Sequence, residues 1–213
     1  ARACEAGYGI ELDVQLSRDG IVMVFHDDTL TRMTGVEDKL SARDAADLMN
    51  LSLAGTNQTI PTLAQVLSLV DGRVPLLVEL KGESLDTSLC GKVAALLSDY
   101  RGAYCIESFN PLLLREMQKH LPDAFYGILY TNVCRAKKKY SLLNMALSCM
   151  ATNVLARPNF IAYDKLERAS LAVRLTTKLY RAPRFVWTIR SEEELAAAKR
   201  NGECAIFEHT TST

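Results

Sequence analysis

The sequence contains 213 residues, of which 48% are hydrophobic and 23% are charged, a composition typical of a globular domain with one substantial core. Lys and Arg together number 25, as do Asp and Glu, so the formal net charge is zero. This balance gives no electrostatic reason to expect nucleic acid or an anionic membrane as a partner, and no apolar run is long enough for stable membrane insertion.

Short apolar runs alternate with segments of helical periodicity along the chain. Strands are predicted over residues 9–16, 74–81, 103–109, 125–130, 160–164, 185–189 and 205–207. Helices are predicted over residues 42–49, 61–70, 86–100, 111–121, 142–150 and 166–180. Ser41 and Asn110 are the expected N-caps of two of them, and a last helix begins at Ser191 with a capping box and ends at Asn201-Gly202. A turn at residues 18–20 and an apolar run at 21–26 extend the first strand as a hairpin.

This order of elements predicts an α/β fold with a parallel sheet and right-handed crossovers, as in a (β/α)₈ TIM barrel. Seven strands besides the hairpin extension leave the barrel short by about one βα unit at the N-terminus. Residues 1–7 would be the tail of the preceding helix, and residues 1–213 a single, N-terminally incomplete domain. Because the chain opens with Ala1 and not Met, we expect the native start upstream, and a lost leader stays open.

Two strands carry acidic side chains on their polar faces. Glu11 and Asp13 share one face of the strand at 9–16, roughly 7 Å apart along it. Both would point into a barrel, where leaving two buried carboxylates ionised is costly unless a hard divalent cation binds them. An exposed strand face with both groups in water is the alternative. Glu79 and Lys81 repeat the pattern at the C-terminal end of another strand, where barrel enzymes place their chemistry, and this repetition favours a site.

His26 and Trp187 are further candidates for which two interpretations stay open. His26 closes the hairpin extension, and an imidazole suits proton transfer near neutral pH. A histidine beside Asp27 and Asp28 in a turn can equally have a structural, hydrogen-bonding role. Trp187 is the only tryptophan, and packing in the core and contact with a substrate are equally compatible with the sequence.

Several motifs occur in the order and at the intervals of one known family. They are GIELDVQLSRDG at 9–20, VFHDDTLTRMTG at 24–35, IPTL at 60–63, VELK at 78–81, SFNP at 108–111 and VWT at 186–188. Over nearly the whole chain, the sequence therefore resembles the glycerophosphodiester phosphodiesterase family. The first block is the most specific of these motifs.

The resemblance implies a TIM barrel that uses Ca²⁺ or Mg²⁺ to hydrolyse a small-molecule glycerophosphodiester to an alcohol and sn-glycerol 3-phosphate. By resemblance, the metal ligands are Glu11, Asp13 and Glu79. His26 would be one of two histidines that act as general acid and base. Lys81 would lie beside the metal-bound phosphate, and Trp187 would border the glycerol end of the substrate.

The sequence departs from the family pattern at both ends. The family's second catalytic histidine belongs to a His-Arg pair on its first strand, which is absent here together with the expected βα unit, so truncation is favoured over divergence. We therefore expect little turnover from these 213 residues alone. The last strand is followed by Glu208 and His209 in place of the family's Asp, and His209 and His120 are interpreted as structural.

Two functional alternatives remain. The chain could be a catalytically incompetent barrel that binds metal and phosphate, or a related barrel phospholipase. The second is disfavoured because the sequence shows no amphipathic basic helix for membrane docking, and the basic run at 135–139 is interpreted as a solvated loop. Six cysteines without a C-x-x-C pair suggest a reducing, cytoplasmic location. The sequence does not specify the leaving alcohol, the native metal or the oligomeric state.

Overall fold

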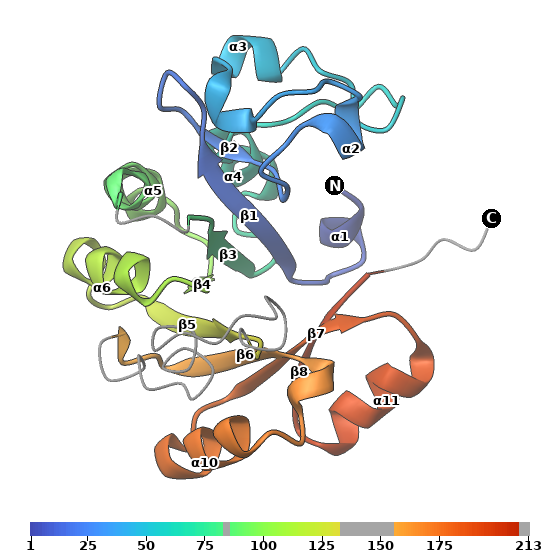
Figure 1. Cartoon of the computed structure of the whole chain (residues 1–213), viewed down its shortest axis with the longest axis vertical. Helices are drawn as coiled ribbons and strands as arrows, with labels where there is room; N and C mark the ends of the chain where they lie inside the picture. The colour runs from blue at the N-terminus through green and yellow to red at the C-terminus, as the bar shows by residue number, and fades with distance from the viewer. Residues whose placement is uncertain (83–85, 133–155, 209–213) are drawn as a thin grey trace. The chain divides into compact units, whose positions relative to one another are not determined.

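The computed structural model describes residues 1–82, 86–132 and 156–208 (Figure 1). The chain divides into two compact units, one formed by residues 1–106 and 116–124 and the other by residues 107–115 and the chain from residue 125 onward. The helix expected at 142–150, the basic run at 135–139 and His209 lie outside the described residues. The expectation of a single domain stays a prediction.

The first unit is built on β1 (Ile10–Leu16), which lies between β2 (Val22–Val24) and β3 (Leu76–Leu80). β1 pairs antiparallel with β2 and parallel with β3, so the predicted hairpin extension is confirmed. β4 (Tyr104–Ser108) follows β3 in the strand order. The helical elements of this unit are α1 (Arg2–Glu5), α2 (Thr31–Thr34), η1 (Leu40–Ala42), α3 (Ala45–Leu48), α4 (Leu63–Val70) and α5 (Ser88–Ser98).

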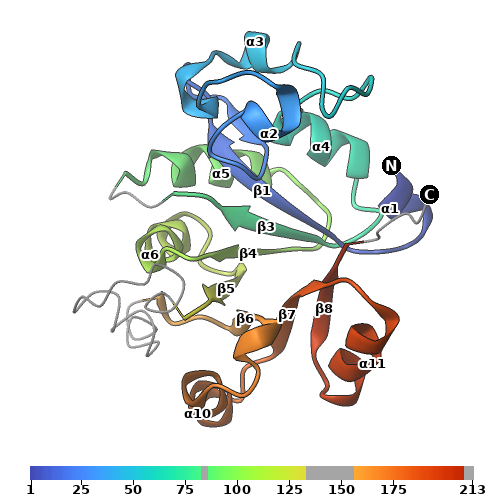
Figure 2. The same cartoon turned by 45° about the vertical axis from the view of Figure 1, so that its right-hand side comes forward.

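The second unit continues the alternation of strand and helix. Its strands are β5 (Phe125–Tyr130), β6 (Phe160–Asp164), β7 (Arg184–Ile189) and β8 (Cys204–Phe207). β5 with β6, β6 with β7 and β7 with β8 all pair in parallel, as an α/β fold requires. Its helical elements are η2 (Lys165–Glu167), α10 (Leu171–Tyr180) and α11 (Glu192–Arg200), and α11 packs on β7 and β8 (Figure 2). α6 (Pro111–His120) contributes residues to both units.

Most of the predicted helix ends are confirmed by their hydrogen bonds. The Asn110 side chain accepts from the backbone N–H of Leu112, at the start of α6. Ser191 caps α11 by accepting from the N–H of Glu194, but the Glu194 carboxylate accepts from Arg190 N, one residue before the position that a capping box would use. A complete capping box joins Thr62 and Gln65 at the start of α4.

Two of the predicted helices begin elsewhere. Ser41 does not cap a helix at 42–49, because it lies within η1, and α3 begins after Asp44 instead. The helix predicted over residues 166–180 is divided into η2 and α10. Two competing caps explain the division, since the Asp164 side chain caps η2 and the Ser170 hydroxyl caps α10.

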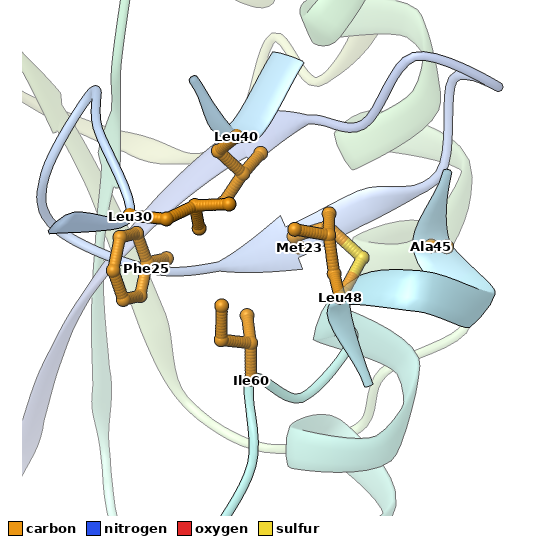
Figure 3. Packing of buried hydrophobic residues seen from close by; sticks show 7 residues of the cluster. All are labelled: Met23, Phe25, Leu30, Leu40, Ala45, Leu48 and Ile60. Carbon is orange, nitrogen blue, oxygen red and sulfur yellow. The ribbon is translucent and has the colours of Figure 1, made fainter. Parts of the chain in front are cut away.

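A buried apolar cluster organises the segment between β2 and α4 (Figure 3). Its members are Met23, Phe25, Leu30, Leu40, Ala45, Leu48 and Ile60. Phe25 and Leu30 enter the cluster from the two ends of one short loop, and Leu40 and Leu48 come from the following helical turns. The loop at residues 26–29 is therefore fixed on both sides by buried side chains.

The helix α10 exposes apolar side chains together with basic ones. Leu171, Leu175 and Leu179 recur every four residues and are exposed, as are Arg174 and Lys178. The expectation that the chain has no amphipathic basic helix is therefore wrong. The spacing of the leucines resembles a core-facing stripe, whereas α10 buries Val173 on another face. No helix in the described part of the chain has the length and apolar character needed to cross a membrane.

The core of the second unit contains an aromatic group around Phe160, which is fully buried. The Phe160 ring stacks on Phe125 with centroids 5.7 Å apart and meets Phe185 at 4.6 Å. Gly127 lies directly opposite Phe160 in the β5–β6 register. A Cβ atom at Gly127 would stand 2.1 Å from the Phe160 ring, so glycine leaves the space that the ring occupies.

We predict opposite effects for two Gly→Ala substitutions. Gly127→Ala should lower the free energy of unfolding by about 1–3 kcal/mol, because the Phe160 ring is confined by its neighbours and cannot move aside without strain. Gly91→Ala, on the exposed side of α5, meets only ordinary contacts at 3.8 Å and should raise it by up to about 1 kcal/mol through helix propensity. Urea denaturation measures both, and equal effects would contradict the packing described for Phe160.

Candidate functional site

The acidic site is built by the parallel register of β1 and β3. This register places Asp13 directly opposite Glu79, and Glu11 lies two residues earlier on the same face of β1. Glu11 and Glu79 offer carboxylate oxygens within 4.8 Å of one another. Glu11 and Glu79 therefore meet from two neighbouring strands, and Asp13 lies opposite Glu79 in the register. That all three bind one metal ion stays a prediction.

Lys81 joins the two strands through its side chain. Its Nζ lies 2.9 Å from Asp13 Oδ1 and 3.0 Å from Glu79 Oε1. Its backbone N–H donates to Val14 O, which continues the β1–β3 pairing to the end of the strand. Asp13 and Glu79 are only 8% and 7% exposed, so the ammonium bridges two carboxylates that are largely withdrawn from water. Lys81 therefore contacts two of the predicted acidic residues at the C-terminal end of β3.

The electrostatics of the site favour a bound cation. Burial raises the pKa of Glu79 to about 7, with the like charge of Asp13 adding to the rise and the ammonium of Lys81 opposing it. Burial would lower the pKa of Lys81, but the attraction of Glu79 and Asp13 outweighs it, so the ammonium stays charged. The buried carboxylates of Asp13 and Glu79 share one ammonium, and Glu11 lies beside them. A divalent cation with oxygen ligands fits this donor set and would offset the surplus negative charge.

His26 lies on the loop that follows β2, and this loop is attached to β1. The N–H of Phe25 donates to the carbonyl oxygen of Asp13 at 3.0 Å, one residue before His26. The His26 side chain is 68% exposed, and its Nδ1 lies 2.7 Å from Asp27 Oδ1. Asp27 is in turn held by Arg32, whose hydrogen bonds lower the pKa of that carboxyl to about 2 against the opposing effect of burial. Because the ionised Asp27 can only accept, Nδ1 carries the proton and Nε2 is the nitrogen left for exchange.

Trp187 lies on β7 in the second unit and is partly buried. Its ring meets Phe109 edge to face, with centroids 5.8 Å apart, so core packing accounts for part of its surface. No acceptor among the described residues lies within hydrogen-bonding distance of its buried Nε1. The indole N–H is thus buried without an acceptor among the described residues, and a contact of Trp187 with substrate stays a prediction.

Three features of this region were not predicted from the sequence. Gln15, on the same face of β1 as the acids, donates to two loop carbonyls, at Phe25 and Asp27. The pairing of Asp27 with Arg32 was also missed. In the second unit, Glu107 on β4 is a third missed feature: it is an acid buried at 1% exposure without the neighbouring charge on the same face that singled out Glu79 and Lys81. His120 ends α6 with Nε2 3.7 Å from Glu116 Oε1, a contact compatible with the structural role expected for it.

Comparison with known proteins gives consistent matches. The sequence profile described as the Glycerophosphoryl diester phosphodiesterase family matches residues 1–211. A protein of Caldanaerobacter subterraneus subsp. tengcongensis named glycerophosphodiester phosphodiesterase is 34% identical over 142 residues. That match covers 61% of this chain and 58% of the relative, so it spans less than two thirds of the relative's length.

Solved structures show the same fold. The glycerophosphodiester phosphodiesterase from Thermotoga maritima is 27% identical with a TM-score of 0.71, covering 97% of this chain and 84% of that one. A phosphodiesterase from Oleispira antarctica, solved in complex with the product sn-glycerol-3-phosphate, is 22% identical with a TM-score of 0.79, covering 97% and 83%. These likenesses confirm the expected α/β, TIM-barrel fold.

The raised pKa of Glu79 predicts how stability changes with pH when metal is removed by a chelator. Between pH 4.5 and about 7 the folded protein binds more protons than the unfolded chain, so its free energy of unfolding falls as pH rises. Glu79→Gln removes this titration. Relative to wild type, the variant should therefore gain stability from pH 4.5 to 8, by about 3 kcal/mol at most.

Urea denaturation at several pH values measures the difference, with Glu193→Gln on the exposed start of α11 as the matched control. Parallel pH curves for wild type and Glu79→Gln would show that Glu79 does not titrate in this range.

Proposed function

The chain belongs to the glycerophosphoryl diester phosphodiesterase family, and on that premise we propose that its protein hydrolyses glycerophosphodiesters to an alcohol and sn-glycerol 3-phosphate. The observation that carries the proposal is the meeting of Asp13, Glu79 and Lys81 across β1 and β3, with Glu11 beside them. Further support is the likeness to a phosphodiesterase solved with sn-glycerol-3-phosphate. We propose a small-molecule substrate, since a net charge of zero gives no electrostatic reason to expect nucleic acid.

We propose Glu11, Asp13 and Glu79 as the ligands of a divalent metal, either Ca²⁺ or Mg²⁺. Carboxylate oxygens are the ligands that these hard cations prefer, and the surplus of buried negative charge gives a reason for one to bind. When bound, the ion would neutralise the diester and favour the charge that builds on the phosphoryl oxygens.

The remaining residues of the site have roles that follow from their geometry. Lys81, already held between Asp13 and Glu79, supplies a positive charge for a phosphate oxygen. His26 moves the proton at Nε2, either to the leaving alkoxide or from the nucleophile, because Nδ1 is engaged by Asp27. Trp187, on β7 of the second unit, would border the glycerol end of the substrate, as the family resemblance implies.

We also propose a cytoplasmic location, on the basis of the cysteines. The six cysteines form no C-x-x-C pair. Cys90 is fully buried, and burial raises its thiol pKa to about 11, so it behaves as a small apolar side chain. Cysteines used in this way suit a reducing compartment.

The proposal predicts that the full-length protein releases sn-glycerol 3-phosphate in a metal-dependent way from substrates such as glycerophosphocholine and glycerophosphoethanolamine, whereas the 213 residues alone should show little turnover. A chelator should abolish release, and Ca²⁺ or Mg²⁺ should restore it. Asp13→Asn, Glu79→Gln and His26→Ala should each lower kcat/KM about a hundredfold or more, because each removes a charge or a proton carrier from the reaction. An enzyme-coupled assay of the product measures these values, with Glu193→Gln as a control that should match wild type.

Two other outcomes would contradict the proposal, one at the level of the site residues and one at the level of catalysis. Full activity in both Glu79→Ala and His26→Ala would overturn the site assignment. Binding of Ca²⁺ or Mg²⁺ in calorimetry without release of product would support the alternative, a barrel that binds metal and phosphate without turnover.

One observation favours the second alternative, a related barrel phospholipase. The exposed leucines of α10 lie beside Arg174 and Lys178, the combination with which helices bind anionic lipid surfaces. Phosphatidylinositol in vesicles, offered beside the soluble diesters, separates the two activities. Faster cleavage of the vesicle lipid, reduced by Leu175→Ser but not by Leu69→Ser at an exposed site on α4, would favour the phospholipase.

A further inference from the structure

We propose that Gln15 and Arg32 are positioning residues for His26, Gln15 by fixing the loop on both sides of it and Arg32 by orienting its ring through Asp27. The inference rests on the proposed function, in which His26 transfers the proton. It concerns residues that never need to touch the substrate.

An exposed histidine on a loop requires a physical reason to keep one orientation. The His26 side chain is 68% exposed, so packing does not confine its ring. Its neighbours on either side are anchored, since Phe25 and Leu30 are buried in the apolar cluster (Figure 3). Further backbone bonds hold the loop, from Leu30 N to Asp38 O and from Leu40 N to Asp28 O. These contacts fix where the loop enters and leaves but not the peptides at His26.

Gln15 fixes those peptides from the strand that carries the acids. Its Nε2 donates to Phe25 O at 2.8 Å and to Asp27 O at 2.9 Å, the carbonyls of the two residues that flank His26. A side-chain amide is the group suited to this position, because both of its N–H donors are used on two acceptors. Glu11, Asp13 and Gln15 lie on one face of β1. The same strand therefore positions both the acidic residues and the loop that carries His26.

Arg32 controls the ring through the carboxylate that binds it. Its Nε lies 2.6 Å from Asp27 Oδ2 and its Nη2 2.9 Å from Asp27 Oδ1, a two-pronged pairing that sets the plane of the carboxylate. Asp27 Oδ1 is also the atom that contacts His26 Nδ1 at 2.7 Å. A carboxylate fixed in this way accepts a hydrogen bond from the Nδ1–H group and so leaves Nε2 unprotonated in the neutral ring, the state that a general base requires.

The positioning can be measured without substrate by long-range ¹H–¹⁵N NMR of the histidine rings in the purified protein. We expect neutral His26 to carry its proton on Nδ1 in wild type. Arg32→Gln should shift His26 towards a mixture of the two tautomers, and Arg32→Lys, which keeps the charge, should restore part of the Nδ1 form. Gln15→Met, which keeps the length of the side chain but removes both donors, should broaden the His26 signals.

Arg18→Gln is the matched control. Arg18 forms the same two-pronged pair with Asp44, at 2.8 and 2.6 Å, and is 61% exposed against 64% for Arg32, but no histidine in the described part of the chain forms a hydrogen bond with Asp44. Arg18→Gln should therefore leave the His26 tautomer unchanged.

The kinetic test uses the same variants. Gln15→Met and Arg32→Gln should lower kcat roughly tenfold to a hundredfold with little change in KM, the effect usual for residues that orient a catalytic group. In a His26→Ala background neither should lower kcat further, since they act through that ring. A merely structural role would lower activity equally in both backgrounds.

The proposal is overturned if the His26 tautomer is the same in wild type, Gln15→Met and Arg32→Gln, or if the kinetic losses persist in the His26→Ala background. Full turnover by His26→Ala itself would overturn the proposed role of His26 in catalysis. In that case the NMR comparison alone decides whether Gln15 and Arg32 position the ring.

Discussion

The first unit depends on the contact of one ammonium with two carboxylates that have little access to water. Lys81 Nζ bridges Asp13 and Glu79 across the β1–β3 pair, and without it both acids would be buried beside one another with like charge. Removing a single partner from such a group leaves an uncompensated charge in a low dielectric, which costs far more than the intact pair contributes. The arrangement is therefore more readily explained by ligand binding than by stability.

The strand β1 connects this charge cluster with the rest of the first unit. Its apolar face, with Leu12 and Val14, is buried in the core, while its polar face carries the two acids and Gln15. Its edge pairs with β2 and, through Asp13 O, with the loop of His26. Packing, charge and loop geometry thus meet in seven consecutive residues, the span of β1.

The sequence was sufficient to predict the order of elements and the acidic group. Alternating apolar runs and helical segments specify parallel strands, and a two-residue period specifies which side chains share a face, so Glu11, Asp13, Glu79 and Lys81 could be grouped in advance. Local patterns do not report contacts between distant residues. The bonds of Gln15 to the loop, the pairing of Asp27 with Arg32 and the exposure of the α10 leucines all depend on tertiary structure, and each was missed.

The β1–β3 register has a consequence for the evolution of such a chain. Side chains on a strand alternate between its two faces, so shifting β1 by one residue would exchange the acids for Leu12 and Val14 and turn the carboxylates towards the core. Insertions and deletions within this segment are thus far more damaging to the site than substitutions of its apolar residues. Descendants that keep the site should preserve the exact number of residues from Glu11 to Gln15, even where the intervening apolar side chains have drifted.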